Sequence, residues 1–598
     1  MSVSRLWLAL VLVLFCLPLF IGLRSLDLET DEAIYSFAVD RMLEVGEWLQ
    51  PKSSPSETAV FLEKPPLKFW IVAAPIRAGL LPHDEFGLRF WDALFGGIGF
   101  LYVFAIGSVL AGPLCGALAV MLLFVHWPLL LDHGLRTNNM EGPLFLSYCG
   151  GLYHFLRWQA TDGRRKQAHA VAVGLYFVLG FMTKFVAAIF LPLVLGLGAL
   201  GFRATRAKLA ADWQLWLSVS GLVIALIAPW FIYAYVQFGS ELWNTMFAAH
   251  VYERMTIGLN QAHVHPWNYY FDMMAEGFER SGLRWLVPIG LLVLLLQSIR
   301  RQWFEGTLVV LWGTLPLILI SAGSSKLYHY AYPFLPPLTI AAGYVVALFV
   351  MLAPVVLRRV LEYIEDLVAE VSPRLVRIAA QPMMRSIGMG LIWLSAGLAI
   401  GAVLLGVVRI GIGNVQLFKS SGVIRPLIAI VVAGILIRRS ALVATLVVLL
   451  TVSWWMPISV YESTIRQLRV ERHPIRDASE CVRQVEAKQG SAHPVGLYVD
   501  TDSSMWHPIY YYFRRIQPWT RQVNPAPAIL ERNLHDPGGL RPSLVQEDRY
   551  RNYLHGPDAS RFSGGPSPPM ISMFEYVLLL PGPYSSCSNE AVLQTAGK

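Results

Sequence analysis

The sequence contains few charged residues. Only 15% of its 598 residues are Asp, Glu, Lys or Arg, whereas 55% are hydrophobic and the mean hydropathy is +0.50. Soluble globular domains contain about 25% charged residues, so this composition excludes that class. The chain is instead predicted to be a polytopic membrane protein, because its uncharged stretches are long enough to cross about 30 Å of hydrocarbon.

Cysteine is also scarce, with five residues in the whole chain. Cys16, Cys115 and Cys149 fall in apolar segments, so we interpret them as small packing residues rather than metal ligands. Cys481 and Cys587 fall in a polar C-terminal tail. They could form a disulfide only if that tail faces an oxidising compartment.

Acidic residues are outnumbered by basic ones, 40 against 48, which gives a formal net charge of +8. Such an excess can indicate nucleic-acid binding. Here, however, most basic residues cluster in short loops between apolar segments, so no nucleic-acid partner is predicted. No internal repeat is evident, and the inverted symmetry of many transporters is not visible in the sequence.

The apolar segments predict about thirteen membrane-spanning helices. The first is interpreted as a retained helix rather than a cleaved signal peptide, because no small-residue cleavage site follows it. The predicted spans are 6–23, 87–110, 113–131, 141–157, 168–183, 186–202, 214–236, 283–299, 306–322, 333–353, 388–411, 423–438 and 440–457.

The basic residues predict the orientation of these spans. They gather in alternate connections, namely 157–166, 203–208, 300–301, 354–386 and 438–439. The positive-inside rule makes these connections cytoplasmic. The loops 24–86 and 237–282 and the C-terminal tail then face outward, which is the periplasm if the membrane is a bacterial inner membrane.

The organisation predicted is therefore all-α in the membrane with a smaller domain outside it. Residues 1–459 form the transmembrane domain, and 460–598 form an outward-facing soluble α/β domain with expected strands at 495–499, 509–513 and 576–580. Residues 31–46 have an apolar helical face and are expected to form an interfacial helix within the 24–86 loop. Residues 357–377 are expected to form a cytoplasmic surface helix.

Five cations stand at or near the outward ends of these spans, where the positive-inside rule disfavours them. Each one alone could be a snorkelling anchor. Five cations from separate outward loops instead favour a shared anionic ligand, such as a phosphate or diphosphate on a lipid headgroup. The five are Lys64, Arg136, Lys184, Arg254 and Lys326.

Carboxylates accompany these cations. Asp31 and Glu32 open the amphipathic run, and Glu63 precedes Lys64 in a Glu-Lys-Pro-Pro motif. Charges at the mouth of an apolar bundle are costly near lipid and by default suggest function. Neighbouring residues of a helix point about 100° apart, so Asp31 and Glu32 need not face one ligand. The remaining candidate groups are Glu141, His250 and Tyr330.

One use of such a site is transfer of a sugar from a membrane-embedded polyprenyl phosphate. Lysine and arginine stabilise the charge of a leaving phosphate, and a carboxylate suits an oxocarbenium-like sugar or a hydroxyl acceptor. The alternative is a transporter or flippase of lipid-linked or anionic substrates. That function predicts charges near the middle of the membrane, whereas these candidates gather at one face. A non-catalytic scaffold would leave the Glu-Lys-Pro-Pro motif unexplained.

Motifs of familiar order and spacing run through about residues 25–340. They are Asp31-Glu-Ala-Ile-Tyr35, Phe61-Leu-Glu-Lys-Pro-Pro-Leu-Lys-Phe-Trp70, Arg136, Asn139-Met-Glu-Gly-Pro143, Leu179-Gly-Phe-Met-Thr-Lys184, Pro229-Trp230, His250 with Arg254, His265-Pro-Trp-Asn-Tyr-Tyr270, and Ser324-Ser-Lys326 with Tyr330. This set resembles the ArnT-like, dolichyl-phosphate-mannose-protein mannosyltransferase-related superfamily. Its members are GT-C fold glycosyltransferases that use lipid-phosphate sugars.

The resemblance implies roles for these residues. Asp31, with Glu32 beside it, would be the key acid and Glu141 the second acid. The cations Lys64, Arg136, Lys184, Arg254 and Lys326, together with Tyr330, would hold the donor phosphate. Glu63 and His250 resemble positions that can bind a divalent metal, such as zinc, magnesium or manganese.

The expected function is an inverting membrane glycosyltransferase. Its donor would be a polyprenyl-phosphate sugar, and its acceptor a lipid A-like lipid, a glycan or a protein. Phe185, Met255 and the glutamate at position 141 depart from the family pattern, which affects the expected substrate more than the expected reaction.

Overall fold

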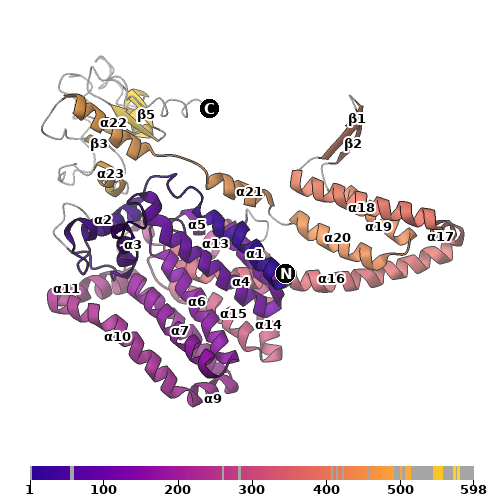
Figure 1. The fold of residues 1–598 in the computed structure, drawn as a ribbon, viewed down its shortest axis with the longest axis horizontal. Helices are drawn as coiled ribbons and strands as arrows, with labels where there is room; N and C mark the ends of the chain where they lie inside the picture. Colours follow the sequence, from indigo (N-terminus) through magenta and orange to yellow (C-terminus); the bar gives the residue numbers. More distant parts are fainter. Residues whose placement is uncertain are drawn as a thin grey trace.

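The computed structural model describes most of the chain, and most of the described chain is helical (Figure 1). The described residues are 3–53, 60–258, 261–279, 284–405, 408–412, 415–420, 423–455, 458–489, 498–500, 506–513, 543–555, 570–573 and 575–579. Cys587 lies outside them, whereas Cys481 lies in helix α22 (Pro474–Gln489).

A bundle of apolar helices forms the body of the molecule (Figure 1). Its core packs α4 against α6 and α16, and α6 against α7, around fully buried side chains that include Trp158, Trp312 and Tyr148. Its helices are α1 (Val3–Val11), η1 (Leu12–Cys16), η2 (Leu17–Phe20), α4 (Glu85–Phe124), α5 (Trp127–Leu131), α6 (Glu141–Ala160), α7 (Gly163–Lys184), η3 (Phe185–Ala188), α8 (Phe190–Gly201), α9 (Arg203–Ala211), α10 (Trp213–Phe238), α14 (Leu286–Arg301), α15 (Phe304–Ser321), η6 (Tyr328–Phe334) and α16 (Leu335–Val371).

Helix α4 covers the predicted span 87–110 and the first part of the predicted span 113–131, whose last residues form α5. Its backbone leaves the helical region at Ala111 and Gly112, where Gly112 has φ 83° and Pro113 follows. Glycine adopts this left-handed conformation without steric cost, and proline cannot continue the hydrogen-bond ladder. The 40-residue element is therefore two helices joined at a bend between the predicted spans 87–110 and 113–131.

The chain is an integral membrane protein with at least seven candidate spans. By length and apolar composition, seven of the described helices can cross a membrane, or eight if the bent pair α8–α9 forms one span. Each of the thirteen predicted ranges overlaps helical structure, but several of those helices, such as α8 and α19 (Ile424–Leu436), are shorter than a full span. One predicted range is wrong at its end, because α18 (Pro382–Leu405) stops before strand β1 (Val408–Ile412). There, Val408, Ile410 and Ile412 alternate with other residues, which favours an extended strand.

Several shorter helices lie outside the bundle helices. The 24–86 loop contains α2 (Thr30–Val45) and α3 (Leu67–Arg77), and the 237–282 loop contains α11 (Ser240–Trp243), η4 (Asn244–Glu253), α12 (Arg254–Thr256), η5 (Gln261–His263) and α13 (Tyr269–Glu279). Helix α2 occupies the predicted interfacial segment. It begins with a capping box between Glu29 and Glu32 and ends at Gly46, whose φ is 79°.

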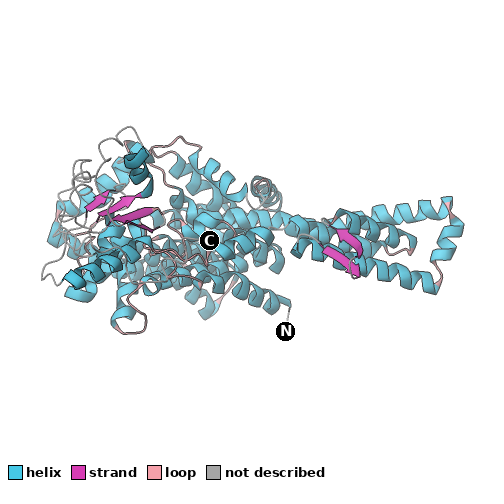
Figure 2. Cartoon of the chain, turned by 90° about the horizontal axis from the view of Figure 1, so that it is seen from above, coloured by secondary structure: helices cyan, strands magenta, loops and turns pink. Residues whose placement is uncertain are grey.

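Helix α16 leaves the bundle and continues into a long arm (Figures 1 and 2). The predicted surface helix 357–377 is thus the end of α16 together with α17 (Pro373–Ala379). The arm also contains α18, a hairpin of β1 and β2 (Val415–Ser420), α19 and α20 (Ser440–Trp455).

The C-terminal part combines helices with a small sheet, as predicted. After the connecting helix α21 (Ile458–Gln467), it contains α22, β3 (Tyr498–Asp500), α23 (Trp506–Phe513), β4 (Ser543–Gln546), α25 (Glu547–His555), β5 (Met570–Met573) and β6 (Tyr576–Leu579). The strand order is β3-β4-β6-β5, with β3 and β4 parallel and the other pairs antiparallel. The strand predicted at 509–513 is wrong, because these residues belong to α23. A short continuous apolar run does not distinguish a strand from a helix.

The C-terminal part contacts the beginning of the first outward loop. The Tyr512 hydroxyl accepts a hydrogen bond from the backbone of Leu28 and donates one to Glu85 at the start of α4. Asp27 accepts a 2.7 Å hydrogen bond from the backbone nitrogen of Ile475 in the first turn of α22. These contacts fix residues 27–28, immediately before α2.

Candidate functional site

Asp31 lies in the first turn of α2, at the end of the bundle that carries most of the candidate residues. The capping box satisfies the backbone at the start of this helix and so fixes where its first turn begins. The Asp31 side chain is half-buried, and its Oδ2 lies 3.5 Å from Nε2 of His133. Burial alone would raise the pKa of Asp31, but the hydrogen bond and charge of His133, with the charges of Lys64 and Lys184, lower it. Asp31 is therefore an ionised carboxylate near neutral pH.

His133 links Asp31 to two further carboxylates. Its Nδ1 lies 3.2 Å from Asp132 and 4.0 Å from Glu29. Burial alone would lower the pKa of His133, but its hydrogen bonds with Asp132 and Asp31 raise it to about 11. His133 also has φ 50°, a conformation that is uncommon for a residue with a side chain.

A second imidazole connects His133 to Glu141. The His329 ring stacks on the His133 ring with centroids 4.8 Å apart and planes inclined by 14°. Its Nε2 lies 3.6 Å from Glu141 at the first position of α6, and Glu141 accepts a hydrogen bond from Lys184 at the last position of α7. The two predicted acids, Asp31 and Glu141, are thus joined through a pair of histidines.

Tyr330 joins two of the predicted cations. The Nζ atom of Lys184 lies 5.2 Å from the centre of the Tyr330 ring, and the Tyr330 hydroxyl accepts a 2.8 Å hydrogen bond from Arg254. Backbone hydrogen bonds hold this arrangement, because the amide of Ser325 donates to the carbonyl of Arg254 and that of Lys326 to the carbonyl of His263.

Glu63 and His250 also meet, with Glu63 Oε1 3.4 Å from His250 Nε2. Glu63 Oε2 lies 4.0 Å from Lys64. Burial alone would raise the pKa of Glu63, but the hydrogen bond from His250 and the nearby cations lower it. Two ligands about 2.0–2.2 Å from a tetrahedral metal lie about 3.3–3.6 Å apart, so the Glu63–His250 separation fits a shared divalent ion. Two protein ligands would leave its other positions to water or substrate.

The pKa of Lys64 depends on its burial and on four neighbouring charges. Burial lowers its pKa most. Glu63 and Asp31 raise it, whereas Arg254 and Lys184 lower it further, and the pKa is about 8. Lys64 is mostly buried, with 13% of its side chain exposed. A buried ammonium beside two further cations is stabilised when an anion binds among them.

We refer to these side chains together as the charged cluster. Its members are Asp31, Glu63, Lys64, His133, Glu141, Lys184, His250, Arg254, His329 and Tyr330. Because α6 begins at Glu141 and antiparallel α7 ends at Lys184, the cluster lies at the opposite end of this pair from the basic 157–166 connection. The sequence predicted eight of the ten members, all but His133 and His329.

Glu32 occupies a different position from the one predicted. It is fully buried, and both of its oxygens pair with Arg89 at 2.7 and 2.6 Å. It also accepts hydrogen bonds from the backbone of Asn138 and Glu29. The 100° rotation between consecutive helix positions turns Glu32 into the protein while Asp31 faces the cluster. The structure therefore assigns Glu32 to holding α2 against α4 and the 132–140 loop.

Arg136 and Lys326 also make contacts other than the predicted ones. Arg136 donates to the backbone carbonyls of Leu19 and Ile21. Lys326 is buried and donates to the carbonyls of His265 and Gly323. Backbone carbonyls compete for these cations because each helix end and turn leaves unpaired acceptors. Both residues fix loops around the site rather than joining the charged cluster.

Residues that the sequence analysis missed include His133, His329 and Arg89. His133 lies between the apolar segment that ends at 131 and Arg136, and His329 immediately precedes Tyr330. Their closeness in sequence to the predicted residues Arg136 and Tyr330 was the feature that could have identified them. Arg89 lies inside a predicted span. A charged side chain is rare there and indicates a buried partner of opposite charge.

Comparison with known proteins indicates the family that this chain resembles. A family model described as dolichyl-phosphate-mannose-protein mannosyltransferase matches residues 63–233. A relative from Pseudomonas fluorescens, an undecaprenyl phosphate-alpha-4-amino-4-deoxy-L-arabinose arabinosyl transferase, is 30% identical over 52% of this chain and 54% of its own length. A protein of the same description from Sodalis glossinidius is 27% identical over 56% of this chain and 58% of its own length. The matched part of the chain thus spans little more than half the length of these relatives.

The fold has a solved counterpart. The crystal structure of ArnT from Cupriavidus metallidurans, bound to undecaprenyl phosphate, superposes with a TM-score of 0.57 and 18% sequence identity, and the match covers 98% of both chains. At that identity the likeness establishes the fold, which extends over the arm and the C-terminal part as well as the bundle.

Proposed function

We propose that this chain, which belongs to the ArnT-like family of GT-C glycosyltransferases, transfers a sugar from a polyprenyl-phosphate donor to an acceptor with inversion. The observation that carries the proposal is the convergence of Lys64, Lys184 and Arg254 with the carboxylate of Asp31 at one end of the bundle. Tyr330 connects Lys184 to Arg254, and both of these cations, with Asp31, act on the pKa of Lys64.

The three cations suit the leaving group. When the bond between the anomeric carbon and the phosphate oxygen breaks, its electron pair remains on the phosphate. Ammonium and guanidinium groups stabilise that developing charge strongly, because buried charge-assisted hydrogen bonds need no reorganisation during the reaction. Lys184 is shared with Glu141 before the donor binds, so phosphate binding would redistribute its contacts.

Asp31 suits the acceptor side of the reaction. In the proposed step the acceptor oxygen attacks the anomeric carbon from the face opposite the phosphate. A hydroxyl acceptor transfers its proton to the ionised carboxylate of Asp31, which acts as a general base. An acceptor phosphate is already ionised and needs no base, and Asp31 would then stabilise the cationic sugar.

Glu63 and His250 would hold a divalent metal in this proposal, since their separation and donor types fit one. The metal would supply positive charge near the donor phosphate. Lys64, adjacent to Glu63, contributes its own ammonium at the same place. Lys64 could thus bind the phosphate whether or not Glu63 and His250 hold a metal ion.

The proposed location is the periplasmic face of a bacterial inner membrane. The charged cluster lies opposite the basic 157–166 connection, which the positive-inside rule puts in the cytoplasm. The relatives named above act, by their names, on undecaprenyl-phosphate aminoarabinose. A lipid A-like lipid is accordingly the first acceptor to examine, followed by glycan and protein acceptors.

Purified protein in sealed proteoliposomes, supplied with radiolabelled polyprenyl-phosphate sugars and a panel of lipid, glycan and protein acceptors, tests the proposal. We expect label to move to an acceptor, with loss of transfer in Lys64→Gln. Lys52→Gln is the matched control, because Lys52 lies in the same loop and pairs with Glu47 at 3.7 Å outside the charged cluster. Movement of labelled lipid across the bilayer without transfer would instead identify a flippase and reject the enzyme. Equal transfer by the two variants would reject the site.

A further inference from the structure

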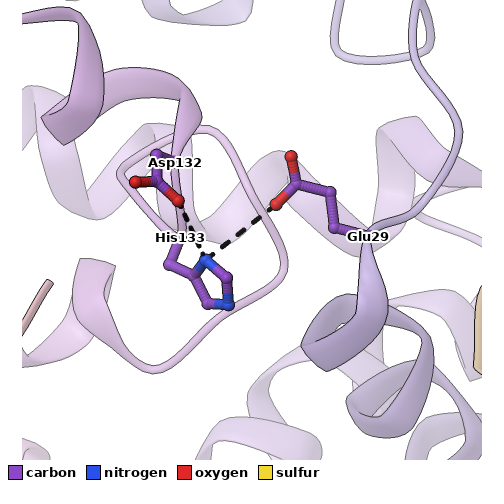
Figure 3. A group of neighbouring side chains, drawn as sticks. All are labelled: Glu29, Asp132 and His133. Atoms are coloured by element: carbon purple, nitrogen blue, oxygen red, sulfur yellow. Dashed lines mark hydrogen bonds and ion pairs between the residues drawn. The ribbon is translucent and has the colours of Figure 1, made fainter. Parts of the chain in front are cut away.

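A second group of metal-type ligands lies beside Asp31. Glu29 is the N-cap of α2, and Asp132 and His133 follow α5, about 100 residues later in the chain. Figure 3 shows the two carboxylates converging on one edge of the His133 imidazole. They approach its Nδ1 atom from two different segments, so a fixed backbone arrangement, rather than sequence adjacency alone, forms the group.

The separations suit a shared cation. Asp132 Oδ1 lies 3.2 Å and Glu29 Oε2 4.0 Å from His133 Nδ1, and the three potential ligand atoms all lie within 4.8 Å of one another. Ligands about 2.0–2.2 Å from one metal lie about 3–4.4 Å apart in tetrahedral or octahedral geometry. Small rotations of the half-exposed Glu29 and Asp132 side chains would bring all three into range.

The charges around His133 are unbalanced. Glu29, Asp132 and Asp31 are three carboxylates that pair with one imidazole. In the described part of the chain, His133 is the one cationic group in ion-pair contact with Glu29 or Asp132. A divalent ion would supply the missing positive charge, and the solvent-exposed sides of both carboxylates leave room for its water ligands.

The other ring nitrogen of His133 has the partner that a metal-binding histidine requires. Nε2 lies 3.5 Å from Asp31, and the ring is held by stacking on His329. A metal-binding histidine almost always donates its second N–H to a carboxylate, which fixes the ring and strengthens its metal bond. Asp31 stands in that outer position, with Nδ1 left to face the Glu29–Asp132 side.

We propose that Glu29, Asp132 and His133 bind a divalent transition-metal ion, with Asp31 as the outer carboxylate. One imidazole and two carboxylates form a donor set that suits zinc or manganese. This site is separate from the Glu63–His250 pair. Its occupant would hold the His133 ring in place and so position Asp31 for the proposed transfer, but binding itself does not depend on that reaction.

The test measures bound metal rather than transfer. The full-length protein in detergent is stripped with chelator, incubated with zinc, desalted and analysed for metal per chain by mass spectrometry. The His250→Gln variant serves as the background because it removes the other candidate pair. We expect one zinc per chain in this variant and none when His133→Gln is added, with a parallel series in manganese. The proposal would be overturned if His250→Gln bound neither zinc nor manganese, or if the double variant retained the metal that His250→Gln binds.

Two milder variants separate coordination from folding. In the His250→Gln background, Glu29→Gln, whose side chain is 49% exposed, should weaken zinc affinity at least tenfold in calorimetry. Asp31→Asn should weaken it 10- to 100-fold, as removal of outer-shell carboxylates does. Unchanged affinity in both variants would show that the group is an ion-pair network and would reject the metal site. Because no donor is present, a failed transfer assay would leave this result unaffected.

Discussion

Asp31 and Glu32 are neighbouring acids for which the structure predicts opposite outcomes on substitution. Glu32 is fully buried against Arg89, with two ion-pair hydrogen bonds of 2.6–2.7 Å and two backbone donors. Glu32→Gln leaves the Arg89 guanidinium buried without a counter-charge. Breaking a buried pair from one side costs about 3–5 kcal/mol, a large share of a typical stability of about 5–15 kcal/mol.

Asp31 has the reverse profile. Its side chain is 40% exposed and its ion-pair contact with His133 is 3.5 Å long. Loss of a partly exposed pair costs at most about 1 kcal/mol. Asp31→Asn should therefore keep the fold but slow transfer to a hydroxyl acceptor by about 10²–10⁴-fold, the usual contribution of a general base.

The assay is thermal unfolding in detergent beside initial rates of sugar transfer for each purified variant. We expect Glu32→Gln to unfold at a clearly lower temperature than the wild type, and Asp31→Asn to unfold normally with little transfer. If Glu32→Gln unfolded at the same temperature as the wild type, the structural assignment of Glu32 would be refuted. Normal transfer by Asp31→Asn to a hydroxyl acceptor would refute its role as a base.

Three further predictions concern other buried groups. Because the pKa of Lys64 is lowered to about 8, its cation is lost as the pH rises through 8, so kcat/KM for the donor should fall there. Lys64→Arg should move that fall above pH 10 in a pH–rate profile, and an unmoved profile would contradict the assignment. Lys68 and Asp92 form a fully buried ion pair. Lys68→Met should lower the free energy of unfolding by about 3–5 kcal/mol, and Lys68→Met/Asp92→Leu should lower it much less. Thermal unfolding measures this difference, and equal unfolding temperatures for the two variants would contradict the prediction. Gly142→Ala would place a Cβ 2.5 Å from Asp92 Oδ1, so the free energy of unfolding should fall by about 1–3 kcal/mol. Unchanged stability would show that α4 and α6 can move apart to accept the methyl group.

The helices were largely predictable from the sequence because their signal is local. An apolar run of about 20 residues specifies a spanning helix wherever it occurs, and each of the thirteen predicted ranges overlaps helical structure. The pairing of helices was not predictable in the same way, because it depends on contacts between distant segments.

The wrong prediction of a strand at 509–513 has a related cause. A five-residue apolar run fits a strand or a helix, and the packing of α23 against α2 decides between them.

The charged cluster was predictable where residues stand at the ends of predicted spans. Glu141 and Lys184 are examples, because antiparallel helices bring such ends together. The burial of Glu32 was not predictable, since its partner Arg89 lies 57 residues away. The placements of Arg136 and Lys326 were also missed. Their partners are backbone carbonyls, which every residue type carries and no sequence pattern marks.

The central claim is that one phosphate-binding site lies among Lys64, Lys184 and Arg254. Its most direct test is a cryo-electron microscopy structure of the protein in nanodiscs with bound polyprenyl phosphate. We predict that the phosphate contacts at least two of these three cations and lies beside Asp31. A phosphate bound at the basic 157–166 end of the bundle, or held by Arg136 and Lys326 away from Lys64, would contradict it.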